Sequence, residues 1–517
     1  MADRLTALDA SLLYMEDTTT PMHIGGVAVF RRPRSGFDYD KLISLIEQRL
    51  PLVPRYRQRV LHVPGHLARP VWADDERFDI THHVRLSALP KPGTQDQLDQ
   101  LVARLMARPL DHHRPLWELY LVEGLQRNRF ALVTKTHYAM VDGVGSIEIG
   151  QVIMDTTAGR PTADEQVWMP EPHPGPAKLV ADAVSEMIAR PGEVVDNVRA
   201  AAGDVVSTAR KVLGTVSGVA SVLGAVTRTE RSSPLNVRIT ADRRFAVART
   251  TLDDLKKVRA AHGGTVNDVI LTVVSGALRA WLMSRGEPVT SHSMVRAMAP
   301  LSVRESPVAE SEARSEQAPG GAVTEVAGAG SVDRGNVVTT GLGTATDVEA
   351  ADLVGARHAA QAGMGGAQVS AYLVDLPVGE PNPVVRLQHI SHAVRGNAVT
   401  GQLVAADALV RLGGFAPPTL HALGARAASA FSRRIFNLVI TNVPGPQVPL
   451  YASGAKLLEM FPVVPLAHNQ ALSIGVTSYD GGVYFGLNAD RSAMPDVDNL
   501  ARMVEEAVEE LLGTVSG

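Results

Sequence analysis

The chain has 517 residues, of which 45 % are hydrophobic and 20 % charged; this composition is ordinary for a globular protein, and the length exceeds what one core supports. A formal net charge of −4 argues against a nucleic-acid partner, and the absence of cysteine excludes disulfides, thiolate catalysis and Cys-based metal sites. The first residues lack the apolar core of a signal peptide, so we expect a cytoplasmic location.

Residues 1–165 alternate strand-like and helix-like segments, which predicts an α/β lobe. Apolar runs predict buried strands at 22–30, 117–122 and 130–136. Leucine and isoleucine at helical spacing predict helices over 39–49 and 95–109.

Residues 166–235 differ in character and are expected to form a helical linker, because a proline-rich stretch at 169–176 breaks regular structure. A charge-free run at 212–227 carries an apolar helical face but is shorter than the roughly 20 residues that a membrane span needs. Two interpretations of this run stay open: a helix lying on a membrane or lipid-droplet surface, and a helix packed onto the body of the protein.

Residues 236–517 return to α/β patterns and predict a second lobe. A strongly apolar helix is expected from Val266 to about Leu282, with Asn267 or Asp268 as its cap. Further strands are expected near 369–375, 437–441, 470–478 and 482–488, and further helices over 381–397 and 495–512. The low-complexity segment 305–348 is too poor in large apolar residues to form a core, so we expect a disordered surface insertion.

The segment from Lys135 to Gly143 carries the strongest signal for chemistry. It follows an apolar strand and has the form His-Tyr-x-x-x-Asp-Gly, similar to an acyltransfer motif His-His-x-x-x-Asp-Gly with one histidine replaced. Reactive side chains at the end of a buried strand are held in place by a rigid scaffold and can still reach a substrate channel.

Six further segments, in order along nearly the whole chain, resemble the bacterial wax ester synthase/diacylglycerol acyltransferase family. They are Leu5–Ala10 with Pro21-Met22-His23, Pro115-Leu116-Trp117, Asn267-Asp268-Val269, Arg296–Arg304, Gln368-Val369-Ser370 with Asp375-Leu376-Pro377, and Thr441–Pro446.

The resemblance implies two lobes similar to chloramphenicol acetyltransferase, with the active-site channel at their interface. It also implies direct transfer of an acyl group from acyl-coenzyme A, as co-substrate, to diacylglycerol or a long-chain alcohol. Neither a bound cofactor nor a metal ion is expected. The protein would be held peripherally on the inner membrane or on lipid droplets.

Tyr138 stands where the family has its general base. A neutral imidazole suits that task because its reference pKa is near 6.5, whereas a tyrosine, with a reference value of about 10, is protonated at pH 7. His137 is therefore the remaining candidate base, the alternative being a buried histidine bonded to a neighbouring backbone group. Asp142 is expected to order the turn through an arginine partner, and Gly143 to allow a positive φ or a close approach of substrate.

Other polar residues receive lesser roles from the resemblance. Asn267, Asp268 and Asn442 are expected to lie along the substrate channel. The pair His112-His113 is interpreted as surface, and Pro115-Leu116-Trp117 as packing. Two alternatives to diacylglycerol acylation stay open: a weak or inactive family member that binds lipid or coats droplets, and transfer to a different hydroxyl.

Overall fold

The structure is a computed structural model that describes residues 3–141, 149–157, 168–189, 233–301, 370–400 and 436–515. The run at 212–227 and the insertion predicted at 305–348 lie outside these described residues, as do Asp142 and Gly143. Residues 1–301 and 370–517 belong to one compact unit.

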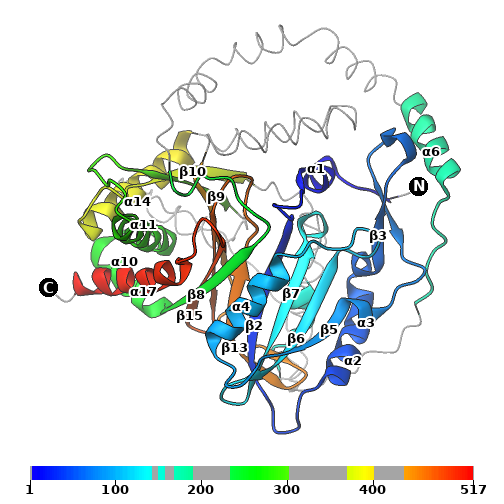
Figure 1. Ribbon diagram of the computed structural model, residues 1–517, viewed down its shortest axis with the longest axis horizontal. Helices are drawn as coiled ribbons and strands as arrows, with labels where there is room; N and C mark the ends of the chain where they lie inside the picture. The colour runs from blue at the N-terminus through cyan, green and yellow to red at the C-terminus, as the bar shows by residue number, and fades with distance from the viewer. Residues whose placement is uncertain are drawn as a thin grey trace, which may run out of the picture. The chain divides into compact units, whose positions relative to one another are not determined.

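The first lobe is built on a six-stranded sheet in the order β12-β13-β2-β7-β6-β5 (Figure 1). In this sheet β5 and β6 run parallel, and the other neighbours are antiparallel. The strands are β2 (His23–Arg31), β5 (Val84–Ala88), β6 (Trp117–Leu125), β7 (Arg129–His137), β12 (Tyr451–Ala452) and β13 (Ala455–Val463). Strands β2, β6 and β7 confirm the three that the apolar runs predicted.

Helices α2 (Tyr39–Arg49) and α4 (Gln95–Met106) confirm the two predicted helices of this lobe. Both begin at a side-chain cap: Asp38 accepts from the backbone N–H of Lys41, and Thr94 forms a capping box with Gln97. Other described elements are α1 (Ala7–Met15), α3 (Ile80–His83), α5 (Ile149–Val152), α6 (Pro176–Ala189) and a three-stranded sheet of β1 (Asp3–Arg4), β4 (Val71–Asp74) and β3 (Gln58–Leu61).

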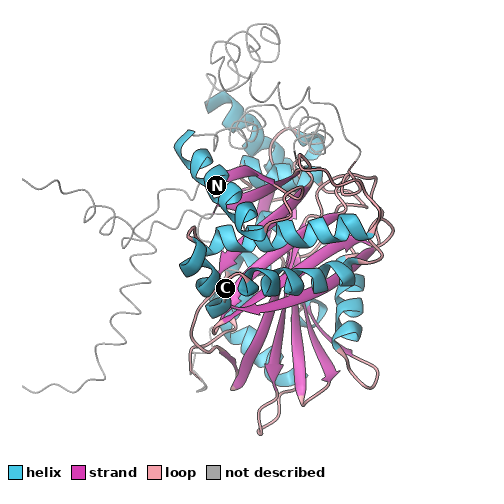
Figure 2. Cartoon of the chain, turned by 90° about the vertical axis from the view of Figure 1, so that its left-hand side faces the viewer, coloured by secondary structure: helices cyan, strands magenta, loops and turns pink. Residues whose placement is uncertain are grey.

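The second lobe has a six-stranded sheet in the order β10-β9-β11-β14-β15-β8. Its strands are β8 (Arg243–Thr251), β9 (Val295–Leu301), β10 (Ser370–Leu376), β11 (Leu438–Pro444), β14 (Leu472–Tyr479) and β15 (Gly482–Asp490). Figure 2 shows long helices lying across one face of the strands. Among the described residues, the helices of this lobe are α10 (Leu252–His262), α11 (Val266–Ser284), α14 (Pro383–Thr400) and α17 (Val497–Gly513). Helices α11, α14 and α17 confirm the three that were predicted, whereas α10 was not predicted.

Helix α11 is the core helix of this lobe. It packs against α14 and α17, and side chains such as Val273, Val274 and Trp281 are fully buried. Among the described helices it has the length and apolar character of a membrane span, but 72 % of that stretch is buried inside the protein. Its apolarity is therefore explained by packing on the sheet and on its neighbouring helices.

A hairpin from the second half of the chain completes the first sheet. Strand β13 pairs with β2. Residues 451–463 were predicted from sequence to belong to the second lobe, but they form part of the first sheet. Pro462 of β13 also contacts the second sheet: a Cβ at Gly486 would lie 1.9 Å from its carbonyl oxygen, so a glycine is required there. Strand β13 thus touches both sheets.

Candidate active site

Three strand ends meet where the motif begins. In the register of the first sheet, His137 at the end of β7 lies opposite His23 at the start of β2, and Thr136 lies opposite Trp117 at the start of β6. The backbone N–H of His137 donates to Leu116 at 2.9 Å, and that of Tyr138 donates to Met22 at 2.9 Å. The motif is therefore fixed by its backbone to both neighbouring segments.

His137 has no exposed surface. Its Nδ1 accepts a 3.0 Å hydrogen bond from the backbone N–H of Ala139, so the proton of the neutral ring is on Nε2. Of the two alternatives given for His137 from sequence, this arrangement matches the buried histidine that is bonded to a neighbouring backbone group. A catalytic role for His137 stays a prediction, and with this bond in place neither of its nitrogens has a lone pair to offer a substrate.

Glu16, which was not among the residues predicted from sequence, faces two histidines. It follows helix α1 as its C-cap residue, and its Oε1 accepts from the backbone N–H of Met22 at 3.3 Å. Its Oε2 lies 2.7 Å from Nε2 of His112 and 3.4 Å from Nε2 of His137. Burial alone would raise the pKa of Glu16, but the contacts with His112 and His137 lower it below its ordinary value, so the carboxylate is ionised.

Of the pair interpreted as surface, His113 is exposed, and His112 is partly exposed but also has contacts beside the motif. The side chain of His112 is 37 % exposed, its ring centre lies 5.9 Å from that of His137, and it pairs with Glu16. The hairpin of β6 and β7 explains this position, because the start of β6 must lie beside the end of β7. Both strands were predicted from sequence, so their pairing was the signal that could have placed His112 next to the motif.

Glu16, His112 and His137 also have the composition of a metal site, since one ligand atom from each lies within 4.8 Å of the others. A metal-binding histidine donates from its second nitrogen and coordinates through a lone pair on the first. His137 does the opposite, because its Nδ1 accepts from Ala139 and its Nε2 is protonated. The donor set fits two imidazoles sharing a carboxylate better than it fits a metal ion.

Tyr138 is half-buried and begins the short helix Tyr138–Met140 that ends the strand. Asp142 and Gly143 lie outside the described residues, so their predicted roles in the turn stay predictions. The segment Leu116-Trp117 is buried, and Nε1 of Trp117 donates to the carbonyl of Tyr56 at 2.8 Å, in agreement with the predicted packing role.

The polar residues predicted in the second lobe come together in part. Nδ2 of Asn442 on β11 donates to Oδ1 of Asn267 at 3.0 Å. The cap of α11 is Thr265, however, and neither Asn267 nor Asp268. Asp268 is the third residue of a capping box: its Oδ2 accepts from the backbone N–H of Thr265 and from Oγ of Ser391, both at 2.9 Å. The cap predicted at Asn267 or Asp268 is therefore wrong, because the capping threonine directly precedes the first helical residue, Val266.

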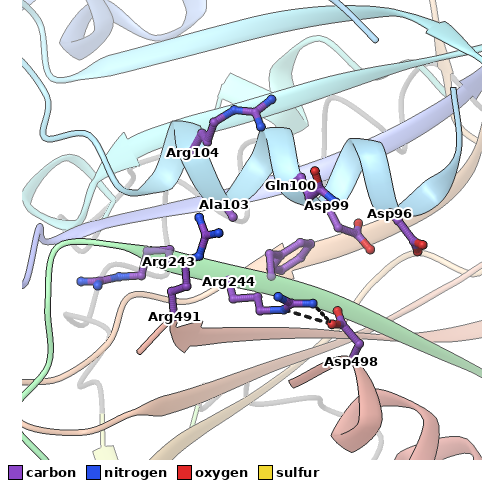
Figure 3. Close-up of a pocket in the computed structure, with 10 residues that line it drawn as sticks. Asp96, Asp99, Gln100, Ala103, Arg104, Arg243, Arg244, Arg491 and Asp498 are labelled. Carbon is purple, nitrogen blue, oxygen red and sulfur yellow. Dashed lines mark hydrogen bonds and ion pairs between the residues drawn. The ribbon is translucent and has the colours of Figure 1, made fainter. Parts of the chain in front are cut away.

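A cavity of about 380 Å³ lies elsewhere, between α4 and β8, and the predicted site residues do not line it (Figure 3). Its wall mixes charges of both signs: Arg244 pairs with Asp498, and Arg243 donates to the backbone carbonyl of Thr240. Asp99 on α4 is buried there, and burial raises the pKa of its carboxyl to about 7. Arg243 and Arg244 already have carbonyl and acidic partners, and a wall of mixed charge does not identify a ligand.

Comparison with family models places these elements in one family. The model of the wax ester synthase/diacylglycerol acyltransferase catalytic domain matches residues 5–270, and the model of the C-terminal domain of the same family matches residues 365–512. The first match contains Glu16, His112 and the motif.

Two relatives from Mycobacterium tuberculosis are named as probable diacylglycerol O-acyltransferases. The protein tgs3 is 49 % identical over 263 residues, which cover 51 % of this chain and 97 % of the relative. The protein tgs2 is 30 % identical over 526 residues, which cover 98 % of each chain.

Two solved structures share the fold. The wax ester synthase/diacylglycerol acyltransferase of Marinobacter aquaeolei VT8 aligns over 100 % of both chains with a TM-score of 0.64 and 24 % identity. The first condensation domain of the calcium-dependent antibiotic synthetase aligns over 100 % of this chain and 97 % of that one, with a TM-score of 0.52 and 14 % identity. The two-lobed α/β fold predicted from sequence is confirmed, and the chain belongs to the wax ester synthase/diacylglycerol acyltransferase family.

Proposed function

We propose that this protein transfers an acyl group from acyl-coenzyme A to the free hydroxyl of diacylglycerol, and that long-chain alcohols are further acceptors. The observation that carries the proposal is the match of the catalytic-domain model to residues 5–270, the range in which three strand ends converge on His137 and Tyr138. The names of the mycobacterial relatives support the same acceptor class.

The reaction needs a group that removes the hydroxyl proton while the oxygen attacks the thioester carbonyl. The acyl carbon then loses the sulfur of coenzyme A and gains the acceptor oxygen. Histidine side chains gathered at one carboxylate supply the right chemistry at the strand ends, which supports acyl transfer despite Tyr138.

Product analysis tests this function. Purified protein is incubated with palmitoyl-coenzyme A and either dioleoylglycerol or hexadecanol, and the lipids are separated and identified by mass. We expect triacylglycerol in the first incubation and a wax ester in the second, neither with heat-denatured protein. Absence of an ester with both acceptors would contradict the proposal.

A second candidate function is favoured by one observation, the tyrosine at position 138 of the motif. In this alternative the chain binds lipid or coats a droplet without chemistry. The variant Tyr138→His separates the two. Ester formation in the wild type supports the enzyme, whereas ester formation in the variant alone supports the lipid-binding relative.

We further propose that the protein works peripherally at a membrane or lipid-droplet surface, because both proposed acceptors are water-insoluble. Flotation with liposomes that contain diacylglycerol tests this location. Recovery of the protein with the liposomes is the expected result, and recovery in the soluble fraction at all lipid concentrations would contradict it.

A further inference from the structure

The contacts of His137 leave neither of its ring nitrogens free to act as a base. Its Nδ1 is occupied by the N–H of Ala139, and its Nε2 carries the proton that faces Glu16. A fully buried ring in this state cannot remove a proton from a substrate. What it does is hold the carboxylate of Glu16 in position from the side of the sheet.

His112, unlike His137, keeps a ring nitrogen with a free lone pair. A separation of 2.7 Å between its Nε2 and Oε2 of Glu16 requires a proton between them, so the lone pair of the neutral ring is on Nδ1. Among the described residues, none forms a hydrogen bond with this Nδ1. The side chain is 37 % exposed, so a substrate can approach the ring.

The local charges make this imidazole a stronger base. The pKa of His112 is raised above its ordinary value, first by the hydrogen bond to Glu16 and then by the charges of Glu16 and Asp111, against the opposing effect of burial. The groups that face it are Glu16 from the end of α1, Asp111 from its own turn and His137 from β7. A carboxylate paired with one imidazole nitrogen, which leaves the other basic, is the arrangement that orients a histidine for proton transfer.

The position of His112 is also suitable for a general base, because its ring lies next to the motif. The turn that carries it leads into β6, whose first residue lies opposite Thr136, and its ring is 5.9 Å from that of His137. A base on this turn acts at the same strand ends as the motif.

We propose that His112, oriented by Glu16, is the general base of the acyl transfer and takes over the task for which Tyr138 is unsuited. This inference rests on the proposed acyltransferase function. Nδ1 accepts the proton of the acceptor hydroxyl while the hydroxyl oxygen forms a bond to the thioester carbonyl carbon. The carbon–sulfur bond then breaks, and the same proton passes from Nδ1 to the departing sulfur to give free coenzyme A. Glu16 and His137 are positioning residues.

The test compares His112→Gln with the matched control His113→Gln in the full-length protein. His113 is exposed, and its backbone N–H alone is bonded in the turn, to Asp111. We expect His112→Gln to lower kcat by about 10²–10⁴-fold, the usual contribution of a general base, with little change in KM for acyl-coenzyme A. His113→Gln should retain wild-type kinetics, and both variants should keep the wild-type circular dichroism spectrum.

Two further measurements separate a base from a merely structural residue. Added imidazole should restore part of the activity of His112→Ala and leave that of His113→Ala unchanged. Glu16→Gln should move the rising limb of the kcat/KM pH profile to lower pH, because the imidazolium of His112 loses the carboxylate that stabilises it.

The outcomes are distinguishable. An active wild type together with a His112→Gln variant within about 2-fold of it overturns the role of His112 and leaves the acyltransferase function intact. A wild type without ester formation from any acceptor overturns the proposed function, and the role of His112 with it. An active wild type with a large kcat loss in His112→Gln, but without rescue by imidazole and without a pH shift in Glu16→Gln, makes His112 structural and also overturns the proposal.

Discussion

The side-chain amide of Asn442 donates a 3.0 Å hydrogen bond to the side-chain oxygen of Asn267, joining strand β11 to the first turn of helix α11. The two residues are 175 positions apart in the chain. The contact fixes the start of the core helix against the sheet, and capping by Thr265 fixes its backbone. Two polar residues that the family resemblance assigns to the channel therefore also have a structural task.

We predict that Asn442→Ala lowers the free energy of unfolding by about 0.5–1.5 kcal/mol, the usual contribution of one hydrogen bond. Asn267→Ala should have an effect of similar size. The double variant should be only slightly less stable than either single variant, because both remove the same bond. Urea denaturation measures all three, and fully additive losses would contradict an energetic coupling of the pair.

Asp99 should make stability depend on pH. Burial raises its pKa to about 7 in the folded protein, so its contribution to stability is fully present below the unfolded value near 3.8 and is lost as pH rises to about 7. Asp99→Asn, which keeps an oxygen to accept from Gln95, should raise the free energy of unfolding at pH 8 by roughly 1–3 kcal/mol and change it little at pH 4. Thermal denaturation at both pH values measures this, with exposed Asp96→Asn as the control. An equal effect of Asp99→Asn at both pH values would show that the carboxyl is not perturbed.

Arg249 should stabilise the contact between the two lobes. Its guanidinium donates to Glu459 on β13 at 2.8 Å and to Gln95 on α4 at 2.9 Å. We expect Arg249→Met to lower the free energy of unfolding by about 1–2 kcal/mol, a range reduced for partial exposure.

The control for Arg249 is Arg502→Met, which removes a pair with Glu506 in which both side chains are more than half exposed. That change should stay within about 0.5 kcal/mol of the wild type. Denaturant unfolding measures both variants. If the free energy of unfolding falls equally in Arg249→Met and Arg502→Met, the contacts of Arg249 contribute no more to stability than an exposed ion pair does.

Tyr138→Phe should retain most of the acyltransferase activity, within about 3-fold of the wild type. A phenol with a reference pKa of about 10 is protonated at neutral pH and is not the expected base. Initial rates with palmitoyl-coenzyme A and dioleoylglycerol measure the effect. A loss of more than about 100-fold in a variant with normal thermal stability would instead make the hydroxyl part of the chemistry.

Local signals predicted the elements well. Helices α2 and α11 and strands β2 and β7 follow from periodicity and apolar runs, because side chains within each element decide which face is buried. The position of β13 could not be predicted in this way. Its pairing with β2 joins residues more than four hundred positions apart, and the pattern of one strand does not specify its partner.

The site was predicted only in part for the same reason. The motif located His137, but the partner that faces it is Glu16, which comes from the end of a helix and stands in no recognisable pattern. The proposed role of His112 rests on a hairpin register and on the tautomer of its neighbour His137, which a single backbone N–H sets. Residue types can suggest a base, but only the contacts of each ring nitrogen show which histidine retains a lone pair.

Acceptor-dependent release of free coenzyme A tests the central claim most directly. The chain contains no cysteine, so a thiol reagent detects released coenzyme A without background from the protein. With palmitoyl-coenzyme A, we predict slow release by the wild type alone and a large, saturable increase when dioleoylglycerol is added. The same low rate with and without every acceptor would contradict the account and leave a lipid-binding protein without acyl transfer.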